Sequence, residues 1–314
     1  MRIFISGACG FIGSNLFNEC SRRGLDVTGV DDLSGGHVEF VDDMSRVILS
    51  DFASDSVLLR VLRQKFDVVV HLAALPRVSY SVEHPLETNE TNVTKTLQLI
   101  DACRGNIKRF VFASSSSVYG GADVLPTPET HPKDPKSPYA LQKSVVEDYL
   151  TLYERYHGLD SASLRFFNVF GPCQLGGTPY STAVSSWLTT IKQGKLMRSD
   201  GDGTQTRDMC YVDNVVDACL RAASTDAPLS AGRFNIACGD SVSNNEILNA
   251  LRARYHLAEK TDAPWRAGDV MHTLADVSRA REVLGYLPTV DVWEGVKRTC
   301  EWYDESWDRI RSLL

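Results

Sequence analysis

The first thirteen residues of the chain constrain its fold more than any other segment. A short apolar run, Arg2–Ser6, leads into a turn with glycines at positions 7, 10 and 13, and an amphipathic stretch follows over 11–23. Glycines at this spacing allow a tight turn and a close approach of the backbone to a pyrophosphate, whose charge the N-terminus of the next helix stabilises. Since glycine turns are common, the motif gains its weight from its place between a strand and a helix.

The first half of the chain alternates strand-like and helix-like stretches. Apolar runs such as 68–70 and 110–112 are typical of parallel strands buried on both faces. The alternation predicts an α/β fold of the Rossmann type, with a doubly wound parallel sheet. Strands are expected at Arg2–Ser6, Asp26–Val30, Val47–Ser50, Asp67–Leu72, Arg109–Ser114 and Asp160–Arg165, and helices near 11–23, 53–66, 86–104 and 137–157.

The end of the second expected strand indicates which dinucleotide binds. Asp31, with Asp32 beside it, lies 18 residues after Gly13, where a carboxylate can bind the ribose hydroxyls of the adenosine. A carboxylate there repels a 2′-phosphate, and no arginine follows before Arg46, so the pattern favours NAD over NADP. The alternative for Asp31 is a turn residue before the Ser-Gly-Gly segment 34–36.

Two later strand ends supply further candidates for the cofactor site. Asp51 follows the third strand and can either reach the adenine or cap a helix. Leu72, Ala73 and Ala74 end the fourth strand with mostly small residues, against which a cofactor can lie.

After residue 165 the alternation loosens. A helix is expected near 184–193, a strand and helix near 209–223, a strand near 233–237, and helices near 243–256 and 276–285. We therefore expect residues 1–170 to form an NAD-binding Rossmann domain that also receives segments near 209–237. Residues 171–314 are expected to form mainly a smaller substrate-binding region, interleaved with the first.

The composition excludes several classes of protein. The 314 residues are 43% hydrophobic and 23% charged, the balance of an ordinary globular chain. A net charge of −7 argues against binding nucleic acid, and no run approaches about 18 apolar residues, so no membrane span is expected. The eight cysteines and seven histidines show no metal-binding spacing, so no metal is expected. The N-terminus does not resemble a signal peptide, which favours a cytoplasmic protein.

Two segments carry candidate catalytic residues. Tyr139 and Lys143 lie four residues apart in an expected helix, so the phenol and the ammonium share a face. A nearby cation lowers the pKa of a phenol from about 10, which lets it take a proton from a hydroxyl. Ser115 and Ser116 end the fifth strand, in the crevice where α/β sheets bind ligands. Taken singly, a chance Tyr–Lys pair and a polar closing loop are the alternatives.

With these residues in view, the chain resembles the extended short-chain dehydrogenases/reductases, and among them the UDP-sugar 4-epimerases, most closely those for UDP-N-acetylglucosamine. The resemblance implies Ser115 as the catalytic serine with Ser116 adjacent, Tyr139 as the base and Lys143 as its activating partner. It rests on the motifs GACGFIG, HLAAL, ASSSSVYG, SPYALQK, LRFFNVFGP, GDGTQTRD and RAGDVMHTLAD. The residues expected at NAD are Gly7, Gly10, Phe11, Ile12, Gly13, Asp31, Asp32, Asp51, Phe52, Leu72, Ala73, Ala74, Tyr139 and Lys143.

The resemblance also implies a set of substrate contacts. Arg207 and Arg266 match two arginines that grip the diphosphate, and the arginine fork suits phosphate oxygens. Thr273 falls where a bulky tyrosine excludes N-acetylated hexoses in other members. The segment 181–186 departs from the proline-containing apolar segment usual before the helix. The complete set is Ser115, Tyr139, Asn168, Thr182, Arg207, Arg266, Asp269 and Thr273.

The activity implied is reversible epimerisation at carbon 4 of a UDP-hexose, through a transient 4-keto intermediate and bound NAD. The small Thr273 favours UDP-GlcNAc/UDP-GalNAc, with UDP-Glc/UDP-Gal as a weaker activity. A UDP-glucuronate 4-epimerase is the first alternative, although such enzymes resemble LRFFTVYGP where this chain reads LRFFNVFGP. The second is a non-catalytic NAD(H)-binding regulator. Members commonly form homodimers through two helices, here expected near 86–104 and 137–157.

Overall fold

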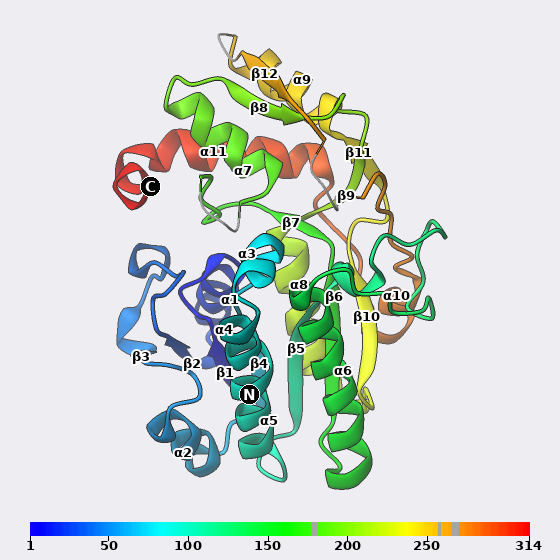
Figure 1. The fold of residues 1–314 in the computed structure, drawn as a ribbon. Helices are drawn as coiled ribbons and strands as arrows, with labels where there is room; N and C mark the ends of the chain where they lie inside the picture. Colours follow the sequence, from blue (N-terminus) through cyan, green and yellow to red (C-terminus); the bar gives the residue numbers. More distant parts are fainter. Residues whose placement is uncertain (178–180, 257–258, 266–269) are drawn as a thin grey trace.

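A parallel sheet of seven strands forms the centre of the molecule (Figure 1). The computed structural model describes residues 1–177, 181–256, 259–265 and 270–314. The strand order β3-β2-β1-β4-β5-β6-β10 reverses direction between β1 and β4, as in a doubly wound sheet, so the predicted fold class is confirmed. The strands are β1 (Arg2–Ser6), β2 (Asp26–Asp31), β3 (Val47–Leu49), β4 (Val68–His71), β5 (Arg109–Ser115), β6 (Ser161–Phe166) and β10 (Gly232–Ile236).

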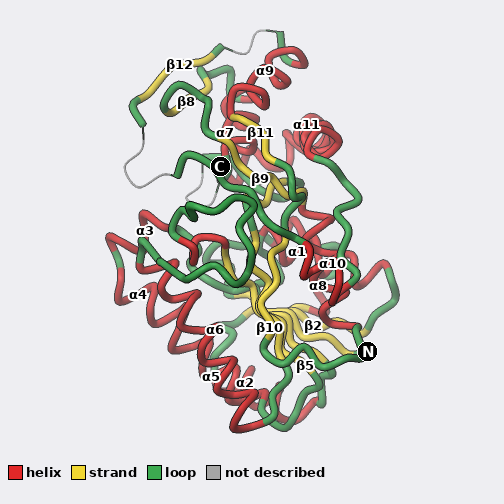
Figure 2. Tube along the Cα trace, turned by 90° about the vertical axis from the view of Figure 1, so that its right-hand side faces the viewer, coloured by secondary structure: helices red, strands yellow, loops and turns green. Residues whose placement is uncertain are grey.

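Helices cover both faces of this sheet, which explains why its strands are apolar on both sides. The tube view in Figure 2 shows the sheet between a layer with α2, α4, α5 and α6 and a layer with α1, α8 and α10. The first layer consists of α2 (Asp55–Gln64), α4 (Pro85–Asn89), α5 (Thr96–Cys103) and α6 (Pro138–His157). The second consists of α1 (Phe11–Arg22), α8 (Val212–Ser224) and α10 (Ser278–Leu284).

The single helix expected over 86–104 is wrong in detail. Between α4 and α5, residues Glu90–Lys95 form a π-helical turn, labelled η3, which is one residue wider than an α-turn. Widened turns of this kind occur often at functional sites. Here the turn carries Asn92, whose side chain is 2% exposed and binds the backbone of a neighbouring loop.

The second half of the chain builds a smaller region above the sheet in Figure 1. It contains a sheet β11-β9-β7 and a pair β12-β8, and the strand expected near 209 belongs to the first of these. Its elements are β7 (Asn168–Phe170), β8 (Met197–Asp200), β9 (Thr206–Tyr211), β11 (Ser241–Ser243), β12 (Lys260–Ala263), α7 (Ala183–Lys192), α9 (Asn244–Arg254) and α11 (Val292–Ile310). β10 and α8 instead return to the main sheet.

A short helix, α3 (Val78–Glu83), lies between β4 and α4 and was not expected from the sequence. Strands β7, β8, β11 and β12 were not expected either, because each carries at most two apolar residues, unlike the equally short β3 and β4. Across the described residues, no helix is long and apolar enough to cross a membrane.

Candidate active site

A cavity of about 620 Å³ opens at the C-terminal edge of the main sheet. Its walls come from the ends of β1, β2, β4 and β5 and from the start of α6, across the point where the strand order reverses. Ligands of doubly wound sheets bind at this place. Of the residues expected to bind ligand, those lining it are Gly7, Gly10, Phe11, Ile12, Gly13, Asp31, Asp32, Phe52, Leu72, Ala73, Ala74, Ser115, Tyr139, Lys143 and Thr182.

Two glycines of the loop, Gly7 and Gly13, have no room for a side chain. Gly7 has a φ of +75°, and a Cβ built on Gly13 would lie 1.8 Å from the carbonyl oxygen of Gly7. Gly10 begins α1 without a side-chain cap, so the first N–H groups of the helix are available to an anion. This geometry fits the pyrophosphate of a dinucleotide.

The two neighbouring aspartates at the end of β2 have different surroundings. Asp31 is 8% exposed and accepts hydrogen bonds from the backbone N–H of Cys9 and of Leu33, both at 2.8 Å. Burial raises the pKa of Asp31. Asp32 is exposed and accepts from the N–H and hydroxyl of Ser34, so it mainly shapes the turn. The buried Asp31, fixed to the glycine loop, is therefore the better fit to an adenosine ribose.

Asp51 does not line the cavity, so its surroundings do not support the expected contact with adenine. Its carboxylate accepts from Lys95 Nζ at 2.5 Å and from the backbone N–H of Ala53 at 2.8 Å. Its neighbours Ser50 and Phe52 line the cavity instead.

Ser115, Tyr139 and Lys143 all line the cavity. Ser137 caps α6 by accepting a hydrogen bond from the N–H of Ala140, so Tyr139 lies in the first turn. Lys143 Nζ donates to the carbonyl of Ala113 at 2.7 Å and lies 5.8 Å from the ring centre of Tyr139. The sequence expectation that the two side chains share a face is met by this geometry.

Burial governs the protonation of this cluster. It raises the pKa of Tyr139 to about 12, although hydrogen bonding with Ser115 opposes the shift. It lowers the pKa of Lys143 to about 7. The phenol is therefore protonated near neutral pH, and a stable phenolate requires additional positive charge in the cavity.

Ser116 does not line the cavity and instead begins a 3₁₀ turn over Ser116–Tyr119. Its neighbour Ser117 interacts with the candidate serine, since the Ser117 hydroxyl donates to Ser115 Oγ at 2.9 Å and its N–H does so at 3.2 Å. Of the two serines proposed from the sequence, only Ser115 lines the cavity, because the chain enters the 3₁₀ turn at Ser116.

Of the described substrate candidates in the second half of the chain, Thr182 lines the cavity, whereas Asn168, Arg207 and Thr273 are not among its lining residues. Asn168 Nδ2 donates to Thr273 Oγ1 at 3.3 Å, and Thr273 Oγ1 also accepts from the N–H of Asp208. Arg207 Nη1 donates to the carbonyls of Thr206 and Met271. These bonds bring β7, β9 and the segment 271–273 together. Arg266 and Asp269 lie outside the described residues.

Two buried carboxylates near the site were not expected from the sequence. Asp208 accepts backbone N–H groups of Cys238, Gly239 and Ala275, and burial raises its pKa to about 6. Glu147 is 1% exposed, pairs with Arg165 and accepts from Ser114. The spacing 139, 143, 147 on one helix face is a signal that could have indicated Glu147.

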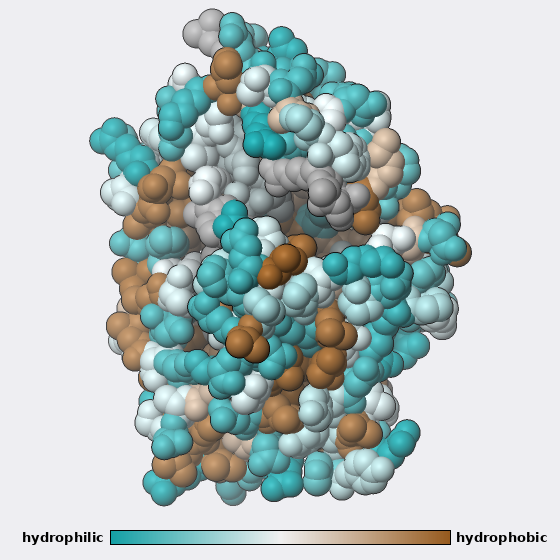
Figure 3. Space-filling model, in the orientation of Figure 1, coloured by the Kyte–Doolittle hydropathy of each residue, from teal (hydrophilic) through white to brown (hydrophobic). Residues whose placement is uncertain are grey.

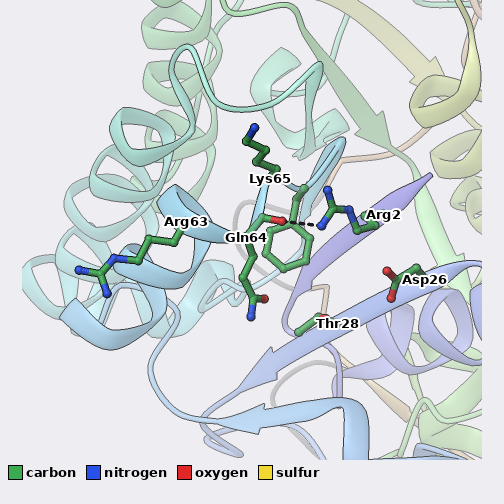
Figure 4. A pocket seen from close by; sticks show the side chains of 7 residues that line it. Arg2, Asp26, Thr28, Arg63, Gln64 and Lys65 are labelled. Carbon is green, nitrogen blue, oxygen red and sulfur yellow. Dashed lines mark hydrogen bonds between the residues drawn. The ribbon is translucent and has the colours of Figure 1, made fainter.

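A second cavity, of about 420 Å³, lies at the opposite edge of the sheet (Figure 4). Arg2 donates to the carbonyl of Gln64, while the side chains of Arg63 and Lys65 point away from Arg2. These cations do not converge on a common point, so we assign this cavity no role. Within the described ranges, no group of three or more His, Cys, Asp or Glu residues is placed to hold a metal ion.

A Rossmann-type sheet whose glycine loop shares one cavity with a Ser–Tyr–Lys cluster defines the class of short-chain dehydrogenases/reductases. The model of the NAD dependent epimerase/dehydratase family matches residues 3–237. The chain belongs to this family, which confirms the expectation of an NAD-dependent enzyme.

Individual relatives cover nearly the whole chain. A UDP-glucose 4-epimerase of Mycolicibacterium smegmatis is 35% identical over 96% of this chain and 98% of that one. The structure of a UDP-N-acetylglucosamine 4-epimerase from Methanobrevibacter ruminantium, in complex with UDP-N-acetylmuramic acid, superposes with a TM-score of 0.89 at 34% identity, covering 97% and 98%. That of the Thermus thermophilus UDP-glucose 4-epimerase in complex with NAD gives 0.87 at 30% identity, covering 97% and 99%.

Proposed function

We propose that this protein, an NAD-dependent UDP-sugar 4-epimerase, interconverts UDP-GlcNAc and UDP-GalNAc, with UDP-Glc/UDP-Gal as a weaker activity. One observation supports the reaction above all others. A single cavity joins the glycine loop at Gly7 to the cluster of Ser115, Tyr139 and Lys143. A cofactor held at the loop therefore extends towards groups that can move a proton.

In the proposed mechanism, the glycine loop and Asp31 bind and orient the cofactor. NAD, when bound, takes a hydride from carbon 4 of the sugar and returns it to the opposite face of the same carbon. Tyr139 removes the proton of the 4-hydroxyl, and Ser115 hydrogen-bonds the same oxygen. The Lys143 ammonium and the positive charge that bound NAD would bring to the cavity stabilise the phenolate. Tyr139 returns the proton once the keto sugar has presented its other face.

The two halves of the chain divide these tasks. We assign residues 1–170, together with α8 and β10, to cofactor binding, and most of 171–314 to substrate binding. Because an acidic chain must hold an anionic diphosphate, Arg207 is the main described cation in this role. The full set assigned to the UDP-sugar is Ser115, Tyr139, Asn168, Thr182, Arg207 and Thr273, with Arg266 and Asp269 from beyond the described residues.

We assign the choice of sugar to Thr273. Its hydroxyl is held by Asn168 and by the N–H of Asp208, so a short side chain is fixed beside β7 and β9. A short side chain leaves room for an acetamido group. Thr273→Tyr should lower kcat/KM for UDP-GlcNAc by at least tenfold relative to UDP-Glc, about the discrimination that pocket size gives. Thr273→Ser is the matched control, and an unchanged ratio in Thr273→Tyr would contradict the assignment.

Proton NMR of separate incubations with UDP-GlcNAc, UDP-Glc and UDP-glucuronate, without added NAD, tests the substrate directly. We expect UDP-GalNAc to appear fastest. Preferential conversion of UDP-glucuronate would favour the alternative 4-epimerase. Silence with all three sugars, in protein that carries NAD, would favour the non-catalytic NAD(H)-binding regulator.

We also propose that the protein is a homodimer. Figure 3 shows exposed apolar groups over α3, α4 and α6, with polar side chains between them. The exposed apolar side chains of these helices include Val82, Leu86 and Leu141, which are 60%, 87% and 52% exposed. Exposed apolar side chains on neighbouring helices can form part of an association surface. Sedimentation should give a dimer that Leu86→Glu with Leu141→Glu converts to a monomer, whereas a wild-type monomer would refute the proposal.

A further inference from the structure

One buried carboxylate joins the smaller region to the main sheet. Asp208 lies in β9 and is 0% exposed. Its Oδ1 accepts the N–H of Cys238 at 2.9 Å, and its Oδ2 accepts the N–H groups of Gly239 at 3.1 Å and Ala275 at 3.0 Å. Cys238 and Gly239 come shortly after β10, an edge strand of the main sheet, and β9 lies above β10 in Figure 1. The carboxylate therefore ties β9 both to the main sheet and to the segment 273–275.

The backbone of Asp208 holds residues that we assign to the UDP-sugar. Its N–H donates to Thr273 Oγ1 at 3.1 Å, and its carbonyl accepts from Asn168 Nδ2 at 3.4 Å. The N–H of Thr273 donates in turn to the carbonyl of Thr206 at 3.1 Å, so the segment 271–273 runs beside the start of β9. Arg207 directly precedes Asp208 in this strand. Three proposed substrate contacts therefore take their positions from one point in β9.

The three N–H groups around the side chain of Asp208 require a carboxylate. An ionised carboxylate has two acceptor oxygens and no donor, whereas an amide of the same shape would turn an NH₂ group towards at least one of these N–H groups. Burial raises the pKa of Asp208 to about 6, so the group is ionised above that pH. Because the side chain is buried, a lost bond leaves a backbone N–H without its partner.

We propose that Asp208 is a positioning residue for substrate binding and for the choice of sugar, which deepens the proposed function and rests on it. It holds Arg207 and Thr273 at a fixed distance from the main sheet, whose cavity contains Tyr139. A UDP-sugar bound by the smaller region is thereby presented to the reacting groups in one position. Asp208 acts through these neighbours, so its loss should alter KM and the preference between sugars more than kcat.

The chain contains a matched control for this role. Asp160 also anchors a distant piece of backbone, since its Oδ1 accepts the N–H groups of Leu229 and Ser230, both at 2.8 Å. It also pairs with the buried Arg109. Asp160 directly precedes β6, so it lies at the N-terminal end of a strand, at the opposite edge of the sheet from the cavity. The same substitution at both sites therefore weakens the same kind of anchor near to and far from the proposed substrate contacts.

The test compares Asp208→Asn with Asp160→Asn in the full-length holoprotein. We expect Asp208→Asn to raise KM for the converted UDP-sugar at least fivefold, with kcat changed less than threefold. The ratio of kcat/KM for UDP-GlcNAc to that for UDP-Glc should fall at least threefold, because Thr273 loses its fixed position. Asp160→Asn should lower Tm at least as much while KM and the ratio stay at their wild-type values. Equal effects of the two substitutions on KM and the ratio, or a wild-type KM in Asp208→Asn, would overturn the proposal.

A milder variant covers the case in which Asp208→Asn does not fold. Thr273→Val keeps a side chain of nearly the same shape but cannot accept the N–H of Asp208, so it loosens the contact without enlarging the side chain. We expect the ratio of kcat/KM for the two sugars to fall at least twofold, whereas a wild-type ratio would overturn the proposal.

Binding of UDP separates this proposal from the proposed function. The Kd of UDP, measured by calorimetry, requires no turnover, and we expect it to rise at least fivefold in Asp208→Asn and to stay unchanged in Asp160→Asn. This result without conversion of any UDP-sugar would support the role of Asp208 in binding and contradict the proposed function alone. An unchanged Kd in Asp208→Asn, with epimerisation intact, would overturn the role of Asp208 alone.

Discussion

The two regions that meet at the cavity hold their functional residues by different means. In the sheet region, Asp31, Ser115 and the glycine loop all lie at the C-terminal ends of parallel strands, which meet at one edge whatever their separation in sequence. In the second region, Asn168 and Thr273 come from a three-residue strand and a loop, joined by single hydrogen bonds. We infer that the sheet region fixes the chemistry, and that the second region decides which sugar is presented to it.

The largest effect should follow from removing the proposed base in the sheet region. Tyr139→Phe keeps the buried ring but removes the hydroxyl, so kcat should fall by about 10³-fold, within the range of general-base catalysis. NAD content and the Kd for UDP-sugar should stay unchanged, as read by absorbance of the released nucleotide and by calorimetry. The control is Tyr153→Phe on the same helix, whose hydroxyl donates to Asp101. A Tyr139→Phe protein within tenfold of wild-type activity would contradict the assignment.

The glycine loop should give the next largest effect. The Cβ of Gly13→Ala would lie 1.8 Å from the Gly7 carbonyl, so the loop must open. We expect the purified variant to lose its NAD. Its free energy of unfolding should be lower by about 2 kcal/mol, a typical cost of overpacking.

Gly105→Ala is the control that separates the loss of NAD from the loss of stability. Gly105 has a φ of +70° and open space around a built Cβ, so alanine there strains the backbone far from the cofactor. Nucleotide content measured after denaturation should stay at the wild-type value in Gly105→Ala. Full NAD content in Gly13→Ala would show that the loop does not contact the cofactor.

A substitution in the second region should alter binding and spare the chemistry. Arg207→Gln removes the cation proposed to bind the diphosphate, and KM for UDP-sugar should rise roughly tenfold, the loss of one charge-assisted contact. The value of kcat and the NAD content should change little. Arg198→Gln, an exposed arginine that pairs with Asp200, is the control. If Arg207→Gln instead lost NAD, the division between the two regions would be wrong.

The smallest effect concerns stability and pH. Burial lowers the pKa of Lys143 from 10.5 to about 7, so between these values the unfolded chain binds a proton that the folded chain does not. Folding stability therefore rises with pH over this range. Lys143→Met lacks this dependence. In cofactor-free protein, the free energy of unfolding of Lys143→Met relative to that of the wild type should therefore fall by roughly 2 kcal/mol between pH 6 and pH 9. Urea unfolding at both pH values measures the difference, and a constant difference would contradict the burial of the charge.

The contrast between the two regions also explains which features could be predicted from the sequence. Expected and observed limits agree for β1 and differ by one residue for β5, because apolar runs and glycine turns are local signals. The π-turn at Asn92 was missed, since a helical pattern does not show one extra residue per turn. Asp208 was missed because its partners, such as Cys238 and Ala275, lie 30 and 67 residues away. Contacts of this kind depend on tertiary structure and leave no periodic pattern.

The central claim is that carbon 4 is epimerised by the groups of one cavity, with a cofactor that stays bound. The most direct measurement is proton NMR of UDP-GlcNAc incubated in D₂O with the purified protein and no added NAD. The account predicts UDP-GalNAc whose hydrogen at carbon 4 remains protium. Deuterium at carbon 4, or no 4-epimer from UDP-GlcNAc, UDP-Glc or UDP-glucuronate in NAD-loaded protein, would contradict it.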